Sequence, residues 1–269
     1  MTDLMLVALT LLTPGMFFEN SVRRDPGPQD PIDAIVHVYF TSDSGARFSC
    51  TGFFLQNGTE EFMVATARHC FQYQVTQACD SGQIEFKTAV GGFSGRCSNV
   101  IVADPRDDFT ILEADFGHDS GSASQKIGNL SLTHQSFKPG TKLKMIGYPS
   151  DPERKGQLTV TENCWIQSDK SPDFVESLTP EENQKRQNAY EEFKKRTAGS
   201  KDTSELRARL SVEHENHNCS VYGGNSGGPI IIDGTRTVVG IPSAYWPGFY
   251  FKNKSESHST EIFQKVVDV

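Results

Sequence analysis

The feature that most restricts the fold of this chain is a succession of short apolar segments separated by turn residues. The segments are rich in β-branched and aromatic residues, and clusters of Gly, Pro, Asn, Asp and Ser divide them, a pattern that predicts β-strands rather than helices. In the first half of the chain, the predicted strands are 34–40, 47–56, 61–67, 83–90, 98–104 and 109–115. In the second half, they are 141–148, 157–166, 229–233, 237–245 and 249–252.

The two groups of strands are divided near residue 125, inside the Gly/Ser-rich segment 117–129, which we interpret as a linker. This division predicts an all-β fold of two antiparallel barrels, each of roughly six strands. We therefore expect a first barrel at 33–125 and a second at 126–269, and a chain of 269 residues is long enough to bury both cores.

One segment of the second half is helical in character. Residues 179–199 begin with a capping Thr followed by Pro180, carry basic residues near the end, and stop at Gly199. We expect a helical insertion in the second barrel at about 170–212, with 204–210 as a further short helix. Its narrow apolar stripe favours a solvated surface element. A short helix is also expected at the C-terminus.

The N-terminal residues predict export. The apolar run at 4–12 is too short to span a bilayer but suits the core of a signal peptide. We expect residues 1–32 to be a signal-like, disordered leader, in which 23–31 is Pro-rich and unstructured. Six cysteines, an even number, favour three disulfides and an oxidising compartment, and the sequence alone leaves their pairing open. The prediction is a secreted or periplasmic protein without stable membrane insertion.

Metal and nucleic acid are disfavoured as ligands. The chain has no Cys-x-x-Cys pair, and "HENHNC" at 214–219 misses the His-Glu-x-x-His motif by one residue, so we expect no metal and no cofactor. A net charge of −8 argues against a protein held by nucleic-acid phosphates.

The glycine-rich stretch "YGGNSGGP" at 222–229 is the strongest candidate for chemistry. A phosphate-binding loop is disfavoured, because Pro229 and a strand follow where Lys and Ser or Thr would be needed. A surface turn needs no partners, whereas a serine nucleophile needs an imidazole base and an orienting carboxylate. His69 follows a predicted strand directly. Asp108 leads into a buried strand, whereas Asp107 faces solvent in this interpretation.

The stretches "CTGFF…VATARHC", "DFTIL" and "GGNSGGP", in the order His, Asp, Ser, resemble the chymotrypsin-like (trypsin-like) serine protease family over roughly 33–265. The resemblance implies that Ser226 is the nucleophile, His69 the general base and then acid, and Asp108 the orienting carboxylate. It also implies an oxyanion hole made of the N–H groups of Gly224 and Ser226. The expected function is a secreted serine endopeptidase that acts on proteins or peptides through an acyl-enzyme, as a monomer.

Disulfides and substrate contacts follow from the same resemblance. The implied disulfide pairs are Cys50–Cys70, Cys79–Cys97 and Cys164–Cys219. Ser220 would form the base of the primary pocket, where the acidic residue of trypsin-like enzymes is absent. The strand "GIPSAY" would pair with the substrate backbone, with Ser243, Ala244 and Tyr245 as substrate-binding residues.

The sequence departs from the zymogen-activated members at the residue before the nucleophile, and it has no "IVGG"-like start. Asn225 stands where those members have an aspartate that pairs with a newly cut N-terminus, so we expect activity without N-terminal insertion. "GNSGGP", "IGYP" and "HNCSVYGGNSG" are nearer the bacterial glutamyl-endopeptidase-like branch. A catalytically silent relative that acts as a binding module is the alternative, disfavoured because all three triad residues are present. An α/β-hydrolase would have Ser before Asp and His.

Overall fold

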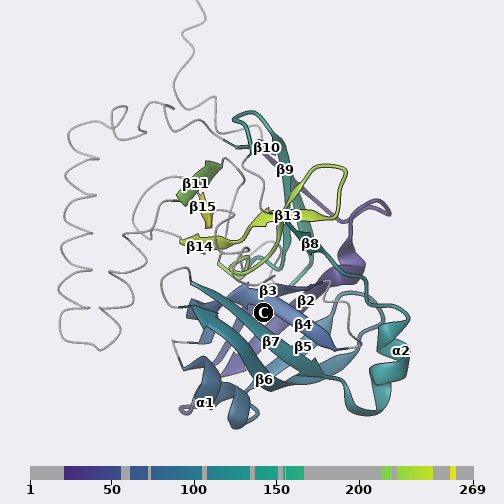
Figure 1. Ribbon diagram of the computed structural model, residues 1–269, viewed down its shortest axis with the longest axis vertical. Coiled ribbons are helices and arrows are strands. Elements are labelled where there is room, and N and C mark those ends of the chain that lie inside the picture. Colours follow the sequence, from purple (N-terminus) through teal and green to yellow (C-terminus); the bar gives the residue numbers. More distant parts are fainter. Residues whose placement is uncertain are drawn as a thin grey trace, which may run out of the picture.

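The structure is a computed structural model in which strands dominate (Figure 1). It describes residues 21–55, 61–71, 74–104, 108–133, 137–150, 154, 156–166, 214–217, 219, 223–244 and 255–258. For residues 104, 214–216, 243–244 and 255–258 only the backbone is described. The predicted helical insertion, the strand at 249–252 and the C-terminal helix lie outside the described residues.

The first half of the chain forms a closed barrel of six antiparallel strands, as predicted (Figure 1). Its strands are β2 (Ile35–Thr41), β3 (Arg47–Phe54), β4 (Phe62–Ala67), β5 (Ile84–Thr88), β6 (Ser94–Asp104) and β7 (Phe109–Asp115). They are hydrogen-bonded in the order β2-β3-β4-β7-β6-β5. Among its fully buried side chains are Phe53, Phe54, Phe71, Phe86 and Phe109, and removing these rings from water is the main stabilising term.

The described strands of the second half, together with β1 from the N-terminal region, are arranged as two sheets, and a second closed barrel is not confirmed. One sheet has the order β1-β10-β9-β12-β13-β8 and the other β11-β15-β14. Their strands are β1 (Val22–Arg24), β8 (Ser131–Leu132), β9 (Lys142–Gly147), β10 (Thr159–Trp165), β11 (His214–His217), β12 (Ile230–Ile232), β13 (Thr237–Gly240), β14 (Pro242–Ala244) and β15 (Ser255–His258). The sheets are joined by a bridge between Ile166 and His217, and by Ile241, which connects β13 to β14.

Short helices occupy some of the connections. They are α1 (Val75–Asp80), α2 (Ser120–Ser124) and the 3-10 helices η2 (Ile32–Ala34), η3 (Arg68–Phe71) and η4 (Gly117–Asp119). Both α2 and η4 fall inside the segment 117–129, which was predicted as a linker. Helices of one turn give no periodic sequence signal, so they are not found by pattern. No helix in the described ranges is long and apolar enough to cross a membrane.

The prediction that residues 23–31 are unstructured is wrong. Val22–Arg24 forms β1, which is antiparallel to β10 with Val22 opposite Glu162. The Arg24 guanidinium lies 2.6 Å from the carboxylate of Asp30 and 2.7 Å from that of Glu162. We call residues 22–33 the N-terminal strap.

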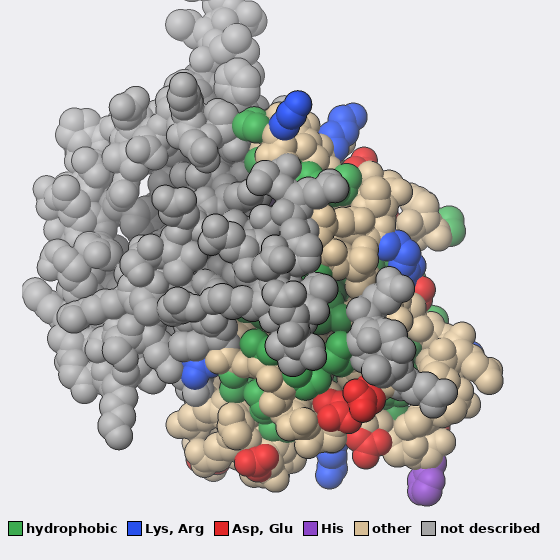
Figure 2. Space-filling model, in the orientation of Figure 1, with side chains coloured by type: hydrophobic (Ala, Val, Ile, Leu, Met, Phe, Trp, Pro, Cys, Tyr) green, Lys and Arg blue, Asp and Glu red, His purple; other side chains and the backbone are tan. Residues whose placement is uncertain are grey.

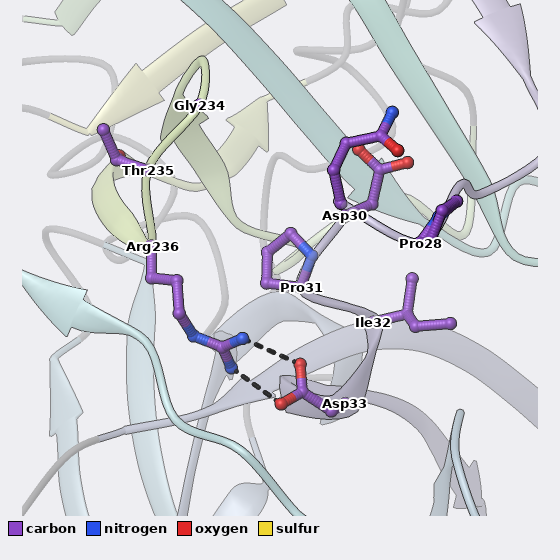
Figure 3. A pocket seen from close by; sticks show the side chains of 9 residues that line it. Pro28, Asp30, Pro31, Ile32, Asp33, Gly234, Thr235 and Arg236 are labelled. Carbon is purple, nitrogen blue, oxygen red and sulfur yellow. Dashed lines mark hydrogen bonds and ion pairs between the residues drawn. The ribbon is translucent and has the colours of Figure 1, made fainter.

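Asp30 is the centre of the strap. Its side chain is fully buried, and Lys144 of β9 lies 3.5 Å from it. Burial alone would raise the pKa of this carboxyl, but hydrogen bonds from Arg24 and from the Gly27 N–H outweigh that effect and lower the pKa. At the end of the strap, Asp33 makes a two-pronged ion pair with Arg236 in the turn between β12 and β13, beside a pocket of about 450 Å³ (Figure 3).

The structure contains three disulfides, and they join the pairs that the resemblance implied. These are Cys50–Cys70, Cys79–Cys97 and Cys164–Cys219. Among the described residues the only large hydrophobic side chains that are exposed are Val22 and Phe48. On the face shown in Figure 2, acidic side chains gather on the first barrel, in agreement with the net charge of −8.

Candidate active site

His69 and Asp108 lie side by side because of the strands next to them. β4 and β7 are antiparallel neighbours, and Ala67 at the end of β4 lies opposite Phe109 at the start of β7. The residues just beyond these strand ends therefore meet at one end of the barrel. There the backbone N–H of Arg68 donates to the carbonyl of Asp108 at 2.8 Å.

The carboxylate of Asp108 holds both the ring and the backbone of His69. Its Oδ2 lies 2.6 Å from Nδ1 of His69, and its Oδ1 accepts the His69 N–H at 2.8 Å. The Asp108 side chain is fully buried, whereas the His69 side chain is 27% exposed. Because an ionised carboxylate can only accept, Nδ1 donates and Nε2 remains as the accepting nitrogen. That tautomer is the one a general base requires.

The backbone of Asp108 is strained. Its φ of 51° lies in the left-handed region, which L-residues other than Gly rarely adopt, although Asp and Asn tolerate it best. Conformations of this kind cost about 1–3 kcal/mol and are concentrated at functional sites, where the surrounding structure maintains them. Here the hydrogen bonds to Arg68 and His69 supply that support.

The loop 223–229 lies against the end of the first barrel that carries His69. A Cβ at Gly227 would meet the side chain of Thr66, the N–H of Ala67 and, at 2.6 Å, the carbonyl of Thr51. The half-buried Ser226 is therefore placed near the chain that leads into His69. Within the described part of the chain, no hydrogen bond joins the His69 ring to the Ser226 hydroxyl.

Hydrogen bonds of neighbouring carbonyls orient the two backbone N–H groups that the resemblance assigns to an oxyanion hole. The carbonyl of Gly223 accepts the N–H of Ser150 at 2.6 Å, and in a trans peptide this turns the Gly224 N–H away from Ser150. The Asn225 carbonyl accepts a hydrogen bond from within the loop at 2.9 Å, which orients the Ser226 N–H in the same manner. Among the described residues neither the Gly224 nor the Ser226 N–H donates a hydrogen bond.

Asn225, which belongs to this loop, and Tyr148 are both buried. The Asn225 side chain is fully buried, and within the described residues its amide has no hydrogen-bond partner. A Cβ at the neighbouring Gly147 would lie 2.8 Å from its Oδ1. The Tyr148 ring is stacked on His37 of β2, with the ring centres 4.1 Å apart. Burial, reinforced by nearby cationic side chains, lowers the pKa of His37 to about 4.

The predicted substrate-binding residues are only partly described. Ser243 and Ala244 lie on β14, and the carbonyl of Pro242 at its start accepts the N–H of Gly227 at 3.2 Å, so β14 begins beside the loop. Their side chains, Ser220, Tyr245 and Asp107 lie outside the described parts. Thr51, in "CTGFF", is a site residue that the sequence did not reveal, because its hydrogen-bond partners are far away in the sequence.

The cysteine and histidine side chains here that could bind a metal ion are already bonded to other protein groups. Cys50, His69 and Cys70 offer atoms within 4.8 Å of one another, but the two sulfurs are joined in a disulfide and Nδ1 of His69 is bonded to Asp108. In "HENHNC", the buried Nδ1 of His217 accepts the N–H of Cys219 at 3.2 Å. Burial lowers the pKa of His217 to about 3, which keeps this ring neutral.

The closed six-stranded barrel, with a second group of strands packed beside it, defines the class of this protein as a mostly β, chymotrypsin-like protease fold. The family model described as the trypsin-like peptidase domain matches residues 50–241, and the chain therefore belongs to that family. No curated protein sequence matches the chain.

Solved protease structures share the fold of this chain at low sequence identity. A thermostable serine protease, AL20, from an extremophilic microorganism has 14% identity and a TM-score of 0.58, with 88% of this chain and 96% of that chain covered. The protease Anisep from Arthrobacter nicotinovorans has 14% identity and a TM-score of 0.54, with 88% and 93% covered. At this identity the similarity concerns the fold alone.

Proposed function

We propose that this protein is a secreted serine endopeptidase in which Ser226, His69 and Asp108 form the catalytic triad. The hydrogen bond of 2.6 Å between the buried Asp108 carboxylate and the His69 ring is the observation that carries the proposal. It fixes the ring, leaves Nε2 as a base, and stabilises the imidazolium that forms when the base takes a proton.

In the proposed reaction the Ser226 hydroxyl attacks the scissile carbonyl and gives its proton to Nε2 of His69. The carbonyl oxygen becomes an oxyanion, which the N–H groups of Gly224 and Ser226 bind. His69 then returns the proton to the leaving amine, and an acyl-enzyme remains. Water, activated by the same imidazole, hydrolyses the acyl-enzyme and restores Ser226. Catalytic hydrogen bonds are often longer before substrate binds, so the His69–Ser226 bond is expected to form in the complex.

The proposal includes activity without insertion of a new N-terminus. The amide of Asn225 carries no charge with which to pair an ammonium group. The segment at 22–24 is already paired with β10, where it makes ion pairs of its own. We also propose that the enzyme lies nearer the bacterial glutamyl-endopeptidase-like branch than the digestive trypsins. The apolar run at 4–12 and the three disulfides support export.

Incubation of the purified protein with a peptide library, with cleavage sites read by mass spectrometry, tests the proposal. The wild type should cut and Ser226→Ala should not, and a fluorophosphonate should label the wild type but not Ser226→Ala. The loss should be on the order of 10⁶-fold in kcat. Ser122→Ala is the matched control, because Ser122 is an exposed serine on α2, and it should retain full activity.

The same experiment distinguishes the proposed endopeptidase from the alternative, a catalytically silent binding module. A folded wild type that neither cuts nor reacts with the fluorophosphonate contradicts the triad and favours a silent binding module. Labelling without cleavage shows a reactive serine to which the library peptides have no access. When cleavage occurs, the residue before each cut gives the preference of the pocket that Ser220 is expected to line.

A further inference from the structure

Thr51 belongs to the first barrel, but its side chain is bonded to the loop that carries Ser226. It lies on β3 and is fully buried. Its hydroxyl donates to the carbonyl of Gly224 at 2.7 Å and accepts the N–H of Tyr148 at 2.9 Å. These partners are 173 and 97 positions away in the sequence, so one hydroxyl connects three distant segments.

The backbone of Thr51 is bonded at the same junction. Its N–H donates to the carbonyl of Ser226 at 3.0 Å, and its own carbonyl accepts the hydroxyl of Thr66 on β4 at 2.7 Å. The N–H bond fixes the main chain of the candidate nucleophile, and the hydroxyl bond fixes the residue two positions earlier. Thr51 is therefore attached to the candidate loop by two separate groups.

Gly224 needs such a restraint. Its φ is 86°, and a Cβ would meet the carbonyl of Tyr148, so glycine is required at this position. Without a side chain, the orientation of its two peptide groups depends on hydrogen bonds. Ser150 holds the peptide before Gly224, and the Thr51 hydroxyl holds the peptide after it.

We infer that Thr51 is a positioning residue for the oxyanion hole, whose hydroxyl holds Gly224 so that the Gly224 N–H faces the developing charge. This inference rests on the proposed function, in which the N–H groups of Gly224 and Ser226 bind the oxyanion. Thr51 acts through Gly224 and not by contact with the reacting atoms.

Thr51→Val removes the hydroxyl with almost no change of shape, and it leaves the Gly224 carbonyl and the Tyr148 N–H without their partner. Loss of an interaction that is made mainly in the transition state lowers kcat and leaves KM nearly unchanged. Removal of a whole oxyanion donor lowers kcat about 10²–10³-fold, so a donor that is only misaligned should cost about 10–10²-fold. Thr51→Ser keeps the hydroxyl and should retain most of the activity.

Thr88→Val is a matched control. Thr88 is also buried, and its hydroxyl also donates to a backbone carbonyl, that of Val90 at 2.7 Å, and accepts a backbone N–H, that of Phe93 at 3.0 Å. These bonds lie in a turn of the first barrel between β5 and β6. Thr88→Val should lower stability as Thr51→Val does and change kcat by less than about twofold.

The assay measures kcat and KM for a peptide found in the library digest, with urea unfolding of each variant. It also measures the inhibition constant of a trifluoromethyl ketone built on that peptide, because its tetrahedral adduct places an oxyanion in the hole. Thr51→Val should weaken the ketone by about the factor lost in kcat. In a Ser226→Ala background, the same substitution should leave the affinity for the uncut peptide unchanged.

Any of three results would overturn this inference and leave the proposed function intact. They are equal losses of kcat in Thr51→Val and Thr88→Val, a change confined to KM in Thr51→Val, or inhibition of Thr51→Val by the ketone that equals that of the wild type. Each of them requires an active wild type. A wild type that neither cleaves peptides nor reacts with a fluorophosphonate overturns the proposed function and, with it, the inference. If Thr51→Val does not fold, Thr51→Ser and Thr51→Ala are compared in its place by the same measurements.

Discussion

Gly227→Ala should destabilise the protein because the second half of the chain approaches the first barrel closely at this glycine. Gly227 has φ of 77°, and the new Cβ would meet the N–H of Ala67, the side chain of Thr66 and the carbonyl of Thr51. Two of these three neighbours are backbone atoms, which cannot move as a side-chain tip can. The clash must therefore displace the loop or the end of β4.

The magnitude has two parts. An L-residue in the left-handed region costs about 1–2 kcal/mol, and forcing an extra carbon into a packed site adds about 1–3 kcal/mol. Gly227→Ala should therefore lower the free energy of unfolding by about 2–5 kcal/mol. Gly92→Ala is the control, because Gly92 has φ of 65° with no atom within 4 Å of the new Cβ. It should cost only the conformational part, about 1–2 kcal/mol.

Urea unfolding followed by circular dichroism measures both variants, and thermal unfolding provides a second readout. Each kcal/mol should lower Tm by about 2–4 °C in a domain of this size. Peptidase activity should fall in Gly227→Ala and not in Gly92→Ala, because only the former displaces Ser226. Equal destabilisation by the two substitutions would refute the close approach on which this reasoning depends.

Three further substitutions compare buried and exposed ionisable side chains. The pKa of His37 is about 4 in the folded state, against about 6.5 in the unfolded state. Below pH 6.5 the unfolded state therefore binds a proton on His37 that the folded state does not bind, and this difference favours unfolding. The free energy of unfolding of the wild type should fall by about 3 kcal/mol between pH 6.5 and 4 because of His37. Urea unfolding of His37→Gln should show a smaller fall over that range. The same fall in both proteins would contradict the lowered pKa of His37. Asp30→Asn should cost about 3 kcal/mol by leaving Arg24 without its buried partner, and should expose the strap to trypsin. Asp33→Asn, which breaks the exposed pair with Arg236, should cost less than about 1 kcal/mol; similar losses would show that the strap is not held at Asp30.

The first barrel could be predicted from the sequence because its signals are local. Alternating apolar residues and turns located all six strands to within a few positions. The exception is β6, which starts at Ser94 rather than at residue 98. Its inward positions there are Gly95 and Cys97, between exposed neighbours, and neither residue is recognised as part of an apolar run.

The pairing of His69 with Asp108 could also be predicted, because each residue directly adjoins a strand and the family resemblance supplied the order. The strap and the role of Thr51 could not. The charges of "RRDPGPQDP" are typical of a solvated segment when seen alone, and their partners Lys144, Arg154 and Glu162 lie over 100 positions away. A threonine in a strand gives no sign of which carbonyl its hydroxyl will bind.

The strap and the loop bear on our proposal that the enzyme is active without insertion of a new N-terminus. In zymogen-activated relatives, a new N-terminus pairs with an aspartate beside the nucleophile. Here the corresponding Asn225 is buried and uncharged, and residues 22–24 are paired with β10. In our proposal the ordering of the loop falls to Thr51, which belongs to a strand of the first barrel and is in place once that barrel folds. The strap then contributes stability, through Asp30, and the loop contributes catalysis, through Gly224. Damage to the strap should therefore lower the free energy of unfolding before it changes kcat, whereas Thr51→Val should lower both.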